Sequence, residues 1–273
     1  MVKELGQFLT AEAAGELLSW SSQVKASKQF GVSVAQVEEA ALTVGILPAR
    51  YQRNRQTIST ENQLVLFRSR VAVLGCGGLG GYVVEQLARL GVGNIVAIDP
   101  DVFEEHNLNR QLFSSIAWLG RSKAQSAFER VSEINPAVTV TARQIAYAPD
   151  NGIELLQGAQ VVVDALDSIP TRMALCQSCL ELQVPLVHGA IAGWYGQVTT
   201  QFPGENTLQK IYGSRVQSKG AEKELGNPSF TPAVVASIEV AEACKILLQK
   251  GEVLRNRELI INLLDMSFQE IAF

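Results

Sequence analysis

The chain has little of what several classes of protein require. Of its 273 residues only 4 are cysteine and 2 are histidine, and aromatic residues make up 7%. Four cysteines without a regular spacing do not describe a disulfide-rich secreted domain, and they suit a reducing compartment. No apolar run is long enough to cross a membrane, and the first residues do not resemble a secretory signal. The sequence therefore predicts a cytoplasmic protein that does not associate with membranes.

An excess of positive charge is also lacking. The chain carries 23 Lys and Arg against 27 Asp and Glu, for a net charge of −4. Nothing in this balance favours nucleic-acid binding. A hydrophobic fraction of 47% with 18% charged residues is typical of a well-packed globular protein. At this length the chain can form one large domain, or one domain with an extension.

A glycine-rich turn between a predicted strand and a predicted helix is the most informative feature that is present. The apolar run 71–74 predicts a buried parallel strand. Gly75, Gly77 and Gly80 follow it with the spacing Gly-x-Gly-x-x-Gly, and the ten residues after them have helical periodicity. The N-terminus of such a helix offers free N–H groups and a partial positive charge to an anion. The turn therefore predicts that a nucleotide phosphate binds here.

Polar residues beyond the turn separate two kinds of nucleotide site. A second predicted strand, 95–99, ends in Asp99, about 20 residues after the turn, where an acid normally meets a ribose hydroxyl. Further polar residues stand at predicted strand ends and helix starts, namely Asp101, Asn107, Arg110, Gln111, Lys123 and Asp167. Arginine and lysine suit phosphates, and Asp167 is a candidate ligand for Mg²⁺. The set favours a nucleoside triphosphate that is attacked at its α-phosphorus.

In order and spacing, these motifs resemble the MoeB/ThiF/HesA family, the bacterial relatives of ubiquitin-activating enzymes. The resemblance covers residue 50 to the end, in segments 50–54, 75–80, 99–101, 107–111, 120–123, 135–136, 164–167, 185–190 and 196–198. Each segment alone is a weak signal, but the combination is specific. We therefore expect an α/β fold with a Rossmann-like mixed sheet. Its parallel, ATP-binding half would be followed by an antiparallel, carrier-binding half, with a small helical extension at the N-terminus.

Adenylation is the activity that the resemblance implies. A family member binds ATP and Mg²⁺ and activates the C-terminal Gly-Gly carboxylate of a small ubiquitin-like sulfur carrier, such as MoaD or ThiS. The products are pyrophosphate and an acyl-adenylate for later thiocarboxylation in molybdopterin or thiamine biosynthesis. The expected partners are that carrier, a separate sulfur donor and a second copy of the chain in a homodimer. Such a transfer needs positioned groups and neutralised charge more than a side-chain nucleophile.

The resemblance also implies roles for individual residues. The expected ATP-binding residues are Gly75, Gly77, Gly78, Gly80, Asp99, Asp101, Asn107, Arg110, Gln111 and Lys123. The expected catalytic residues are Arg53, Arg110, Lys123 and Asp167, with Asp167 also binding Mg²⁺. Within the ATP site, Gly77 and Gly78 would lie against the triphosphate and Asp99 would take the ribose hydroxyls.

An arginine that precedes the nucleotide-binding fold is implied to reach the γ-phosphate of the ATP in the partner subunit. Three arginines stand in the right region, Arg50, Arg53 and Arg55. The family pattern Arg-Tyr-x-Arg places this role at Arg53. The sequence alone leaves the other two open.

The sequence departs from the family at a zinc site. Many relatives carry two Cys-x-x-Cys pairs that bind a structural zinc, but only Cys176 and Cys179 have that spacing here, inside the predicted helix 171–182. One pair cannot complete a tetrahedral site, so we expect no zinc. Neither Cys76, in the glycine turn, nor Cys244, in an apolar helix, resembles an exposed reactive thiol. We therefore expect the reaction to stop at the acyl-adenylate.

The chain divides into a short and a long part. Residues 1–48 predict a helical extension, with helices at 11–20 and 33–44, and Ser33 to Gln36 has the pattern of a capping box. Residues 49–273 predict the adenylation domain.

Within that domain, local patterns predict two halves and their elements. The nucleotide-binding half spans about 62–167, the carrier-binding half about 185–273, and a mobile loop about 203–230. The predicted strands are 71–74, 95–99, 138–142, 161–165 and 259–263, and a long helix covers 233–249.

Two other function classes remain open at this point. An NAD(P)- or FAD-dependent Rossmann oxidoreductase would explain the turn and Asp99, but it leaves Asn107, Arg110 and Lys123 without a role. A non-catalytic nucleotide-binding scaffold would bind ATP without turnover. Binding of NADH would favour the first class, and tight ATP binding without turnover would favour the second.

Overall fold

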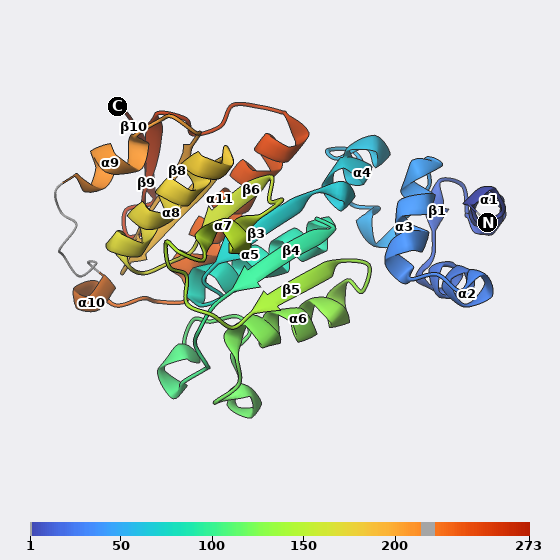
Figure 1. Cartoon of the computed structure of the whole chain (residues 1–273), viewed down its shortest axis with the longest axis horizontal. Helices are drawn as coiled ribbons and strands as arrows, with labels where there is room; N and C mark the ends of the chain where they lie inside the picture. The colour runs from blue at the N-terminus through green and yellow to red at the C-terminus, as the bar shows by residue number, and fades with distance from the viewer. Residues whose placement is uncertain (1, 214–221) are drawn as a thin grey trace.

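A single eight-stranded sheet, with helices on both faces, forms the centre of the computed structural model, which describes residues 2–213 and 222–273 (Figure 1). The strands lie in the order β10-β9-β8-β7-β6-β3-β4-β5. The parallel strands are β3 (Arg70–Leu74), β4 (Asn94–Ile98), β5 (Thr139–Arg143), β6 (Val161–Asp164) and β7 (Leu186–Ala192). The antiparallel ones that follow are β8 (Tyr195–Gln201), β9 (Arg257–Asn262) and β10 (Ser267–Ala272). The mixed Rossmann-like sheet is therefore confirmed.

The order of the parallel strands creates a crevice at one edge of the sheet. The chain runs outward from β3 to β4 and β5, and then returns to β6 on the other side of β3. The connections that leave the carboxyl ends of β3 and β6 therefore diverge. In open α/β sheets this is the position where ligands bind.

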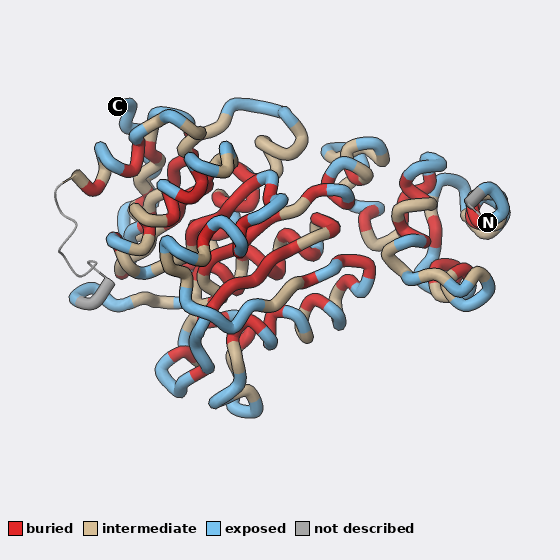
Figure 2. The backbone as a smooth tube through the Cα atoms, viewed as in Figure 1, coloured by how far each residue is buried: buried red, intermediate tan, exposed pale blue. Residues whose placement is uncertain are grey.

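Helices cover both faces of the sheet. On one face lie α5 (Gly78–Leu90), α6 (Lys123–Ile134) and α11 (Phe230–Leu248), and on the other α7 (Gly152–Leu156), α8 (Ile169–Leu182) and α9 (Thr207–Tyr212). Figure 2 shows that burial is concentrated along the central strands. Because β3 and β6 are covered on both faces, they are almost continuously apolar rather than alternating. This explains why their sequences could be recognised as strands.

The predicted strands of the nucleotide-binding half agree with β3 to β6 within one residue at each end. The predicted strand 259–263 overlaps β9, but β10 was not predicted. Phe268 to Ala272 are all exposed in β10, which pairs only with β9, so its residues have no alternation that a sequence pattern could reveal. In the predicted mobile loop, α9 and α10 (Glu222–Leu225) are helical, while 214–221 lies outside the described residues.

The N-terminal segment forms the predicted helical extension, at the end of the molecule where β3 begins (Figure 1). Its helices are α1 (Val2–Glu12), α2 (Trp20–Phe30) and α3 (Val34–Thr43). They enclose their own apolar cluster, in which Leu9, Leu18 and Val37 are fully buried. The Ser33 capping box is confirmed.

The predicted helix 11–20 was wrong. The first helix ends at Glu12, Gly15 adopts a left-handed φ of 64°, and Ser19 caps the next helix by accepting from the N–H of Ser22. Leu17 and Leu18 instead form β1, which pairs with β2 (Leu47–Pro48). The glycine that ends the first helix and the serine that begins the second therefore outweigh the apolar spacing that predicted one helix over 11–20. Among the helices of the described residues, none has the length and apolarity that a membrane crossing needs.

A buried carboxyl group lies between α11 and β7. Glu239 is fully buried, and neither of its oxygens has a hydrogen-bond partner among the described residues. It lies against Gly189, where a Cβ would come within 2.5 Å of the carboxyl carbon. Burial raises the pKa of Glu239 well above its usual value, and Asp164 adds to the shift. Ionisation of Glu239 therefore opposes folding.

We expect Glu239→Gln to stabilise the protein at neutral and alkaline pH. Because the native pKa lies above the unfolded value of about 4.3, wild type loses stability as pH rises above that value, until the native group ionises. Glutamine does not ionise, so the variant should gain about 1–3 kcal/mol over wild type at pH 8, with a smaller gap at pH 5. Urea unfolding at both pH values measures the gap, with Glu154→Gln, on the exposed surface of α7, as control. A gap that does not change with pH would contradict the assignment.

Candidate active site

A cavity of about 520 Å³ opens at the crevice where the strand order reverses. Every predicted ATP-binding residue except Gly80 lines it, and so does Asp167. These side chains come from the carboxyl ends of β3, β4 and β6, from the segment before α6, and from the start of α5 and α6. The structure therefore gathers into one cavity residues that are spread over 93 positions from Gly75 to Asp167.

Two of the glycines hold the floor of the cavity together. Gly75 has a φ of +92°, and a Cβ on it would lie 2.5 Å from the carbonyl oxygen of Ala165, next to β6. A Cβ on Gly80 would lie 1.8 Å from the carbonyl oxygen of Gly75. Any side chain at either position would force β3, α5 and β6 apart. Gly80 thus acts in helix packing, which explains why it does not line the cavity.

The other two glycines leave the first turn of α5 open. Gly77 is the N-cap of this helix and provides no side-chain cap. A Cβ there would lie 3.4 Å from Gln111 Nε2, and one on Gly78 would lie 3.5 Å from Arg110. The buried amide oxygen Oε1 of Gln111 has no partner among the described residues. Helix N–H groups, the Nε2 donor of Gln111 and a guanidinium thus surround a space suited to phosphate.

Asp99 is held in place at the end of β4. Its Oδ2 accepts from the N–H of Cys76 at 2.7 Å, and its Oδ1 accepts from the N–H of Asp101 at 2.8 Å. Burial raises the pKa of Asp99, against the opposing effect of these N–H groups and of Lys123. A carboxylate fixed in this way has a defined orientation toward the cavity, as recognition of a ribose requires.

The cations of the cavity are anchored by neighbouring polar groups. Lys123, the first residue of α6, is buried, and its Nζ lies 3.0 Å from Asp101 Oδ2. Arg110 donates to the carbonyl oxygen of His106 at 3.1 Å and to Asn109 Oδ1 at 2.9 Å. Burial lowers the pKa of Arg110, although arginine stays charged at neutral pH.

The remaining polar residues complete the wall of the cavity. Asn107 Oδ1 accepts from the N–H of Glu104 at 3.0 Å, which fixes the short turn that carries Arg110. Asp167 is exposed, in the turn that follows β6, and its carboxylate is accessible to a ligand in the cavity. An accessible carboxylate beside a phosphate-binding turn fits Mg²⁺, which takes few ligands from protein.

The candidate arginines before the fold do not line this cavity. They precede α4 (Thr60–Arg68), which leads into the amino end of β3 (Figure 1). The residues that line the cavity follow the carboxyl end of that strand. Arg50 is engaged in an ion pair of 2.5 Å with buried Glu38, and Arg55 lies 3.8 Å from Glu16. Arg53 is exposed and has no ion-pair partner among the described residues. Arg53 and Arg55 are thus both exposed, but Arg53 alone of the three has no ion-pair partner among the described residues.

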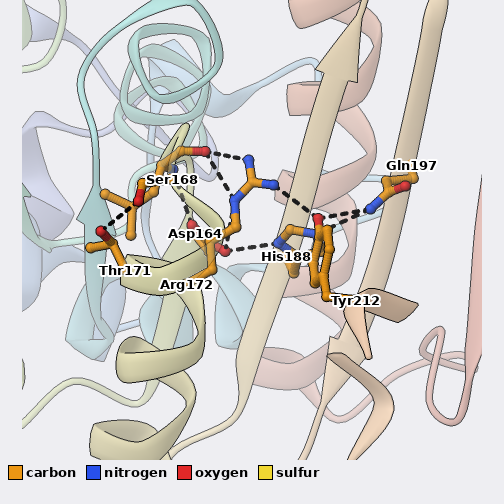
Figure 3. Close-up of polar contacts among 8 residues, drawn as sticks. Asp164, Ser168, Thr171, Arg172, His188, Gln197 and Tyr212 are labelled. Carbon is orange, nitrogen blue, oxygen red and sulfur yellow. Dashed lines mark hydrogen bonds and ion pairs between the residues drawn. The ribbon is translucent and has the colours of Figure 1, made fainter. Parts of the chain in front are cut away.

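Sequence reasoning missed a buried polar network beneath the cavity (Figure 3). Arg172, on α8, donates from Nε to the carbonyl oxygen of Leu166 at 3.1 Å and from Nη1 to the hydroxyl of Tyr212 at 2.8 Å. His188 Nδ1 lies 2.8 Å from Asp164 Oδ2, and its Nε2 lies 2.9 Å from the Tyr212 hydroxyl. The network therefore connects α9 to the residue that precedes Asp167.

The protonation states in this network can be assigned from its contacts. Burial lowers the pKa of His188, so the ring is neutral and donates from Nδ1 to Asp164. Its Nε2 then accepts from Tyr212, whose oxygen accepts from Arg172 and, at 2.9 Å, from Gln197. Burial raises the pKa of Tyr212 to about 12, which keeps its proton in place. The motifs containing Asp164 and His188 were visible in the sequence, but nothing local marks Tyr212 as their partner.

All four cysteines lie in environments that suppress thiol reactivity. Cys76, Cys176 and Cys179 are buried and Cys244 is partly buried. Burial raises the pKa of every one of these thiols, to about 12 for Cys176 and about 11 for Cys244. Cys176 and Cys179 lie on α8, as predicted. Within the described ranges, no three His, Cys, Asp or Glu side chains gather as metal ligands.

Comparison with known proteins assigns the chain to a family. Residues 51–273 match the ThiF family. The chain is 36% identical over 229 residues to the SAMP-activating enzyme E1 of Haloferax volcanii, covering 82% of this chain and 84% of that one. It is 34% identical over 233 residues to the sulfur carrier protein adenylyltransferase of Thermus thermophilus, covering 82% and 86%. The chain spans about half the length of several other curated relatives.

A solved structure shows the same fold. The crystal structure of E. coli MccB with ATP superposes with a TM-score of 0.68 at 22% identity, covering 82% of this chain and 70% of that one. The chain therefore belongs to the ThiF family, and it is an adenylyltransferase by class.

We expect Tyr212→Phe to destabilise the protein. The change removes one hydroxyl that serves His188, Arg172 and Gln197, and it leaves their buried polar atoms short of a partner. A loss of about 1–3 kcal/mol in the free energy of unfolding is the usual cost. Denaturant unfolding measures it, with Tyr195→Phe on the exposed side of β8 as the matched control. Equal losses of unfolding free energy in the two variants would show that the hydrogen bonds of Tyr212 do not stabilise the fold.

Proposed function

We propose that this enzyme uses ATP and Mg²⁺ to adenylate the C-terminal Gly-Gly carboxylate of a small ubiquitin-fold sulfur carrier of the MoaD or ThiS kind. Pyrophosphate leaves, and the acyl-adenylate is available for thiocarboxylation. The names of the Thermus and Haloferax relatives support the substrate class. The observation that carries the proposal is the convergence of Arg110, Lys123 and the open N-terminus of α5 on one cavity.

Each wall of the cavity has a part in this reaction. The triphosphate would lie against Gly77 and Gly78, with Arg110, Gln111 and Lys123 neutralising or hydrogen-bonding its oxygens, and Asn107 beside them. The ribose would meet Asp99 and Asp101. Asp167 would hold Mg²⁺, which supplies positive charge to the phosphates. The carboxylate of the carrier then needs only to be placed in line with the α-phosphorus.

The same residues argue against the two alternatives. A nicotinamide or flavin enzyme would leave Asn107, Arg110 and Lys123 without a role, although all three line this cavity. A scaffold would not need an accessible carboxylate at Asp167 beside the phosphate-binding turn. The charge distribution therefore supports catalysis on a triphosphate with its metal ion.

The thiols bear on how the reaction ends. All four are at least partly buried and have raised pKa values, so none is suited to attack the acyl-adenylate. The proposal therefore includes a separate sulfur donor, and it includes no zinc. The same proposal places the protein in the cytoplasm. It also divides the chain into an extension, 1–48, and an adenylation domain, 49–273, whose halves are 62–167 and 185–273.

A homodimer is also part of the proposal. Arg53 is exposed and lies away from the cavity of its own subunit. In a two-fold symmetric dimer, each subunit would offer this arginine to the γ-phosphate in its partner.

Carrier-dependent exchange of pyrophosphate into ATP tests the reaction. We expect exchange with one Gly-Gly-ended carrier of the same organism, and its loss in Asp167→Ala and Lys123→Ala, because both remove charge from the cavity. Asp150→Ala, an exposed residue outside the cavity, serves as the control and should retain exchange. ATP binding without exchange, whichever carrier is supplied, would favour the scaffold.

Mixing of inactive variants tests the arginine. Arg53→Ala should lower exchange at least about tenfold, whereas Arg55→Ala should change it little. If Arg53 acts across a dimer, mixing Arg53→Ala with Asp167→Ala subunits should restore part of the activity. Each mixed dimer would then contain one site with an intact Asp167 and an arginine from its partner. No recovery on mixing, with subunit exchange verified, would contradict action across the dimer.

A further inference from the structure

The loop that carries Arg53 is held between the helical extension and the sheet domain. It follows the short turn 49–51, and α4 comes after it. The ThiF match begins at residue 51, so the helices that contact this turn from one side lie outside the matched region. These helices do not line the cavity.

From the extension, the hydrogen bonds to this turn involve one buried carboxylate and one amide. Glu38, on α3, has no exposed side-chain surface. Its Oε2 lies 2.5 Å from Arg50 Nη1, and its Oε1 accepts from the Tyr51 hydroxyl at 2.7 Å. Gln23, on α2, accepts from Arg50 Nη2 at 3.1 Å. Two consecutive residues of the turn are thus bound to two helices of the extension.

From the sheet domain, the same two residues are bound by Asn135, at the end of α6. Its Oδ1 accepts from Arg50 Nη1 at 2.7 Å. Its Nδ2 donates to the Tyr51 hydroxyl at 2.8 Å and to the carbonyl oxygen of Ala88 at 2.8 Å. A Cβ on Gly91 would lie 2.5 Å from that hydroxyl, so the Tyr51 side chain packs directly against the glycine backbone.

The position of Arg53 follows from this anchor. The N–H of Asn54 donates to the carbonyl oxygen of Tyr51 at 2.8 Å, and Arg53 lies inside that turn. Its guanidinium is exposed, while the residues two and three positions before it are bound on both sides. The loop is therefore held at its base, while the exposed Arg53 has no ion-pair partner within the part of the chain that the structure describes.

The polar contacts of Arg50 and Tyr51 with Glu38 and Asn135 indicate that the position of this turn matters. A buried ion pair with satisfied hydrogen bonds adds little stability over apolar residues of similar size, because both charges lose their hydration. Directional bonds instead select one arrangement of the groups that they join. Attachment alone does not need such a contact, because apolar side chains already join the extension to the domain: Leu42 and Leu47 lie in one buried cluster with Phe67.

We infer that the helical extension positions the arginine loop, and that Glu38 and Asn135 are positioning residues for the action of Arg53 on the nucleotide of a second copy of the chain. The inference rests on the proposed function. It gives the residues before the family match a role in the reaction of the partner subunit rather than in their own cavity.

Subunit mixing separates this role from simple damage to the fold. We expect Glu38→Ala to lower carrier-dependent exchange about tenfold, because a small displacement of a catalytic group is costly. Mixing with Asp167→Ala should restore part of this activity, since the intact site then receives Arg53 from a loop with Glu38 present. Mixing with Arg53→Ala should restore none. Glu39→Ala, whose exposed carboxylate pairs with Arg68 at 2.8 Å, is the neighbouring control and should stay active.

Each outcome bears on one claim. Full activity in Arg53→Ala would remove the proposed trans arginine itself. Recovery of Arg53→Ala, but not of Glu38→Ala, on mixing with Asp167→Ala would overturn the inference while leaving the proposed function intact. If thermal unfolding shows that Glu38→Ala loses its fold, Tyr51→Phe takes its place, since it removes one hydroxyl and keeps the ion pair. Tyr51→Phe should lose less exchange activity than Glu38→Ala, and mixing with Asp167→Ala, but not with Arg53→Ala, should restore it. Failure of Asp167→Ala to restore it would overturn the inference.

Discussion

The close approach of β3, α5 and β6 is the constraint on which the site depends. Gly80 lies so near the carbonyl oxygen of Gly75, and Gly75 so near that of Ala165, that neither position has space for a Cβ. This contact brings the N-terminus of α5 to the point where the strand order reverses. The carboxylates at the ends of β4 and β6, Asp99 and Asp167, then lie around the same cavity. Without this contact, the N-terminus of α5 and the two carboxylates would not lie around one cavity.

Charge determines which nucleotide such a cavity suits. The glycine turn and Asp99 are common to dinucleotide and triphosphate sites. This site differs from a dinucleotide site in the segment after β4. That segment brings Arg110 and Gln111 over the start of α5 and ends at Lys123. These groups add positive charge and amide donors on the side of the turn where further phosphates would lie. Asp101 holds Lys123 in this position, so the cation is oriented before a ligand arrives.

Sequence reasoning placed correctly the elements and cavity-lining residues whose signals are local. The strands β3 to β6, the turn at Gly75 to Gly80, and the polar residues of the cavity all have signals within a few neighbouring residues. It failed where a partner lies far along the chain. Arg172 and Tyr212 are 40 positions apart, and Arg50 and Asn135 are 85 apart. Only the folded chain shows that these residues meet, and therefore that Arg50 is held by its neighbours while Arg53 has no ion-pair partner in the described ranges.

The most direct test of the central claim is to follow which phosphate of ATP reaches the carrier. Wild-type enzyme and carrier are incubated with ATP labelled at the α- or the γ-phosphate, quenched in acid, and the carrier is recovered. Attack at the α-phosphorus predicts that only the α-label is bound to the carrier, and that Asp167→Ala prevents it. Transfer of the γ-label would contradict adenylation, and so would failure of either label to reach a carrier that the enzyme binds together with ATP.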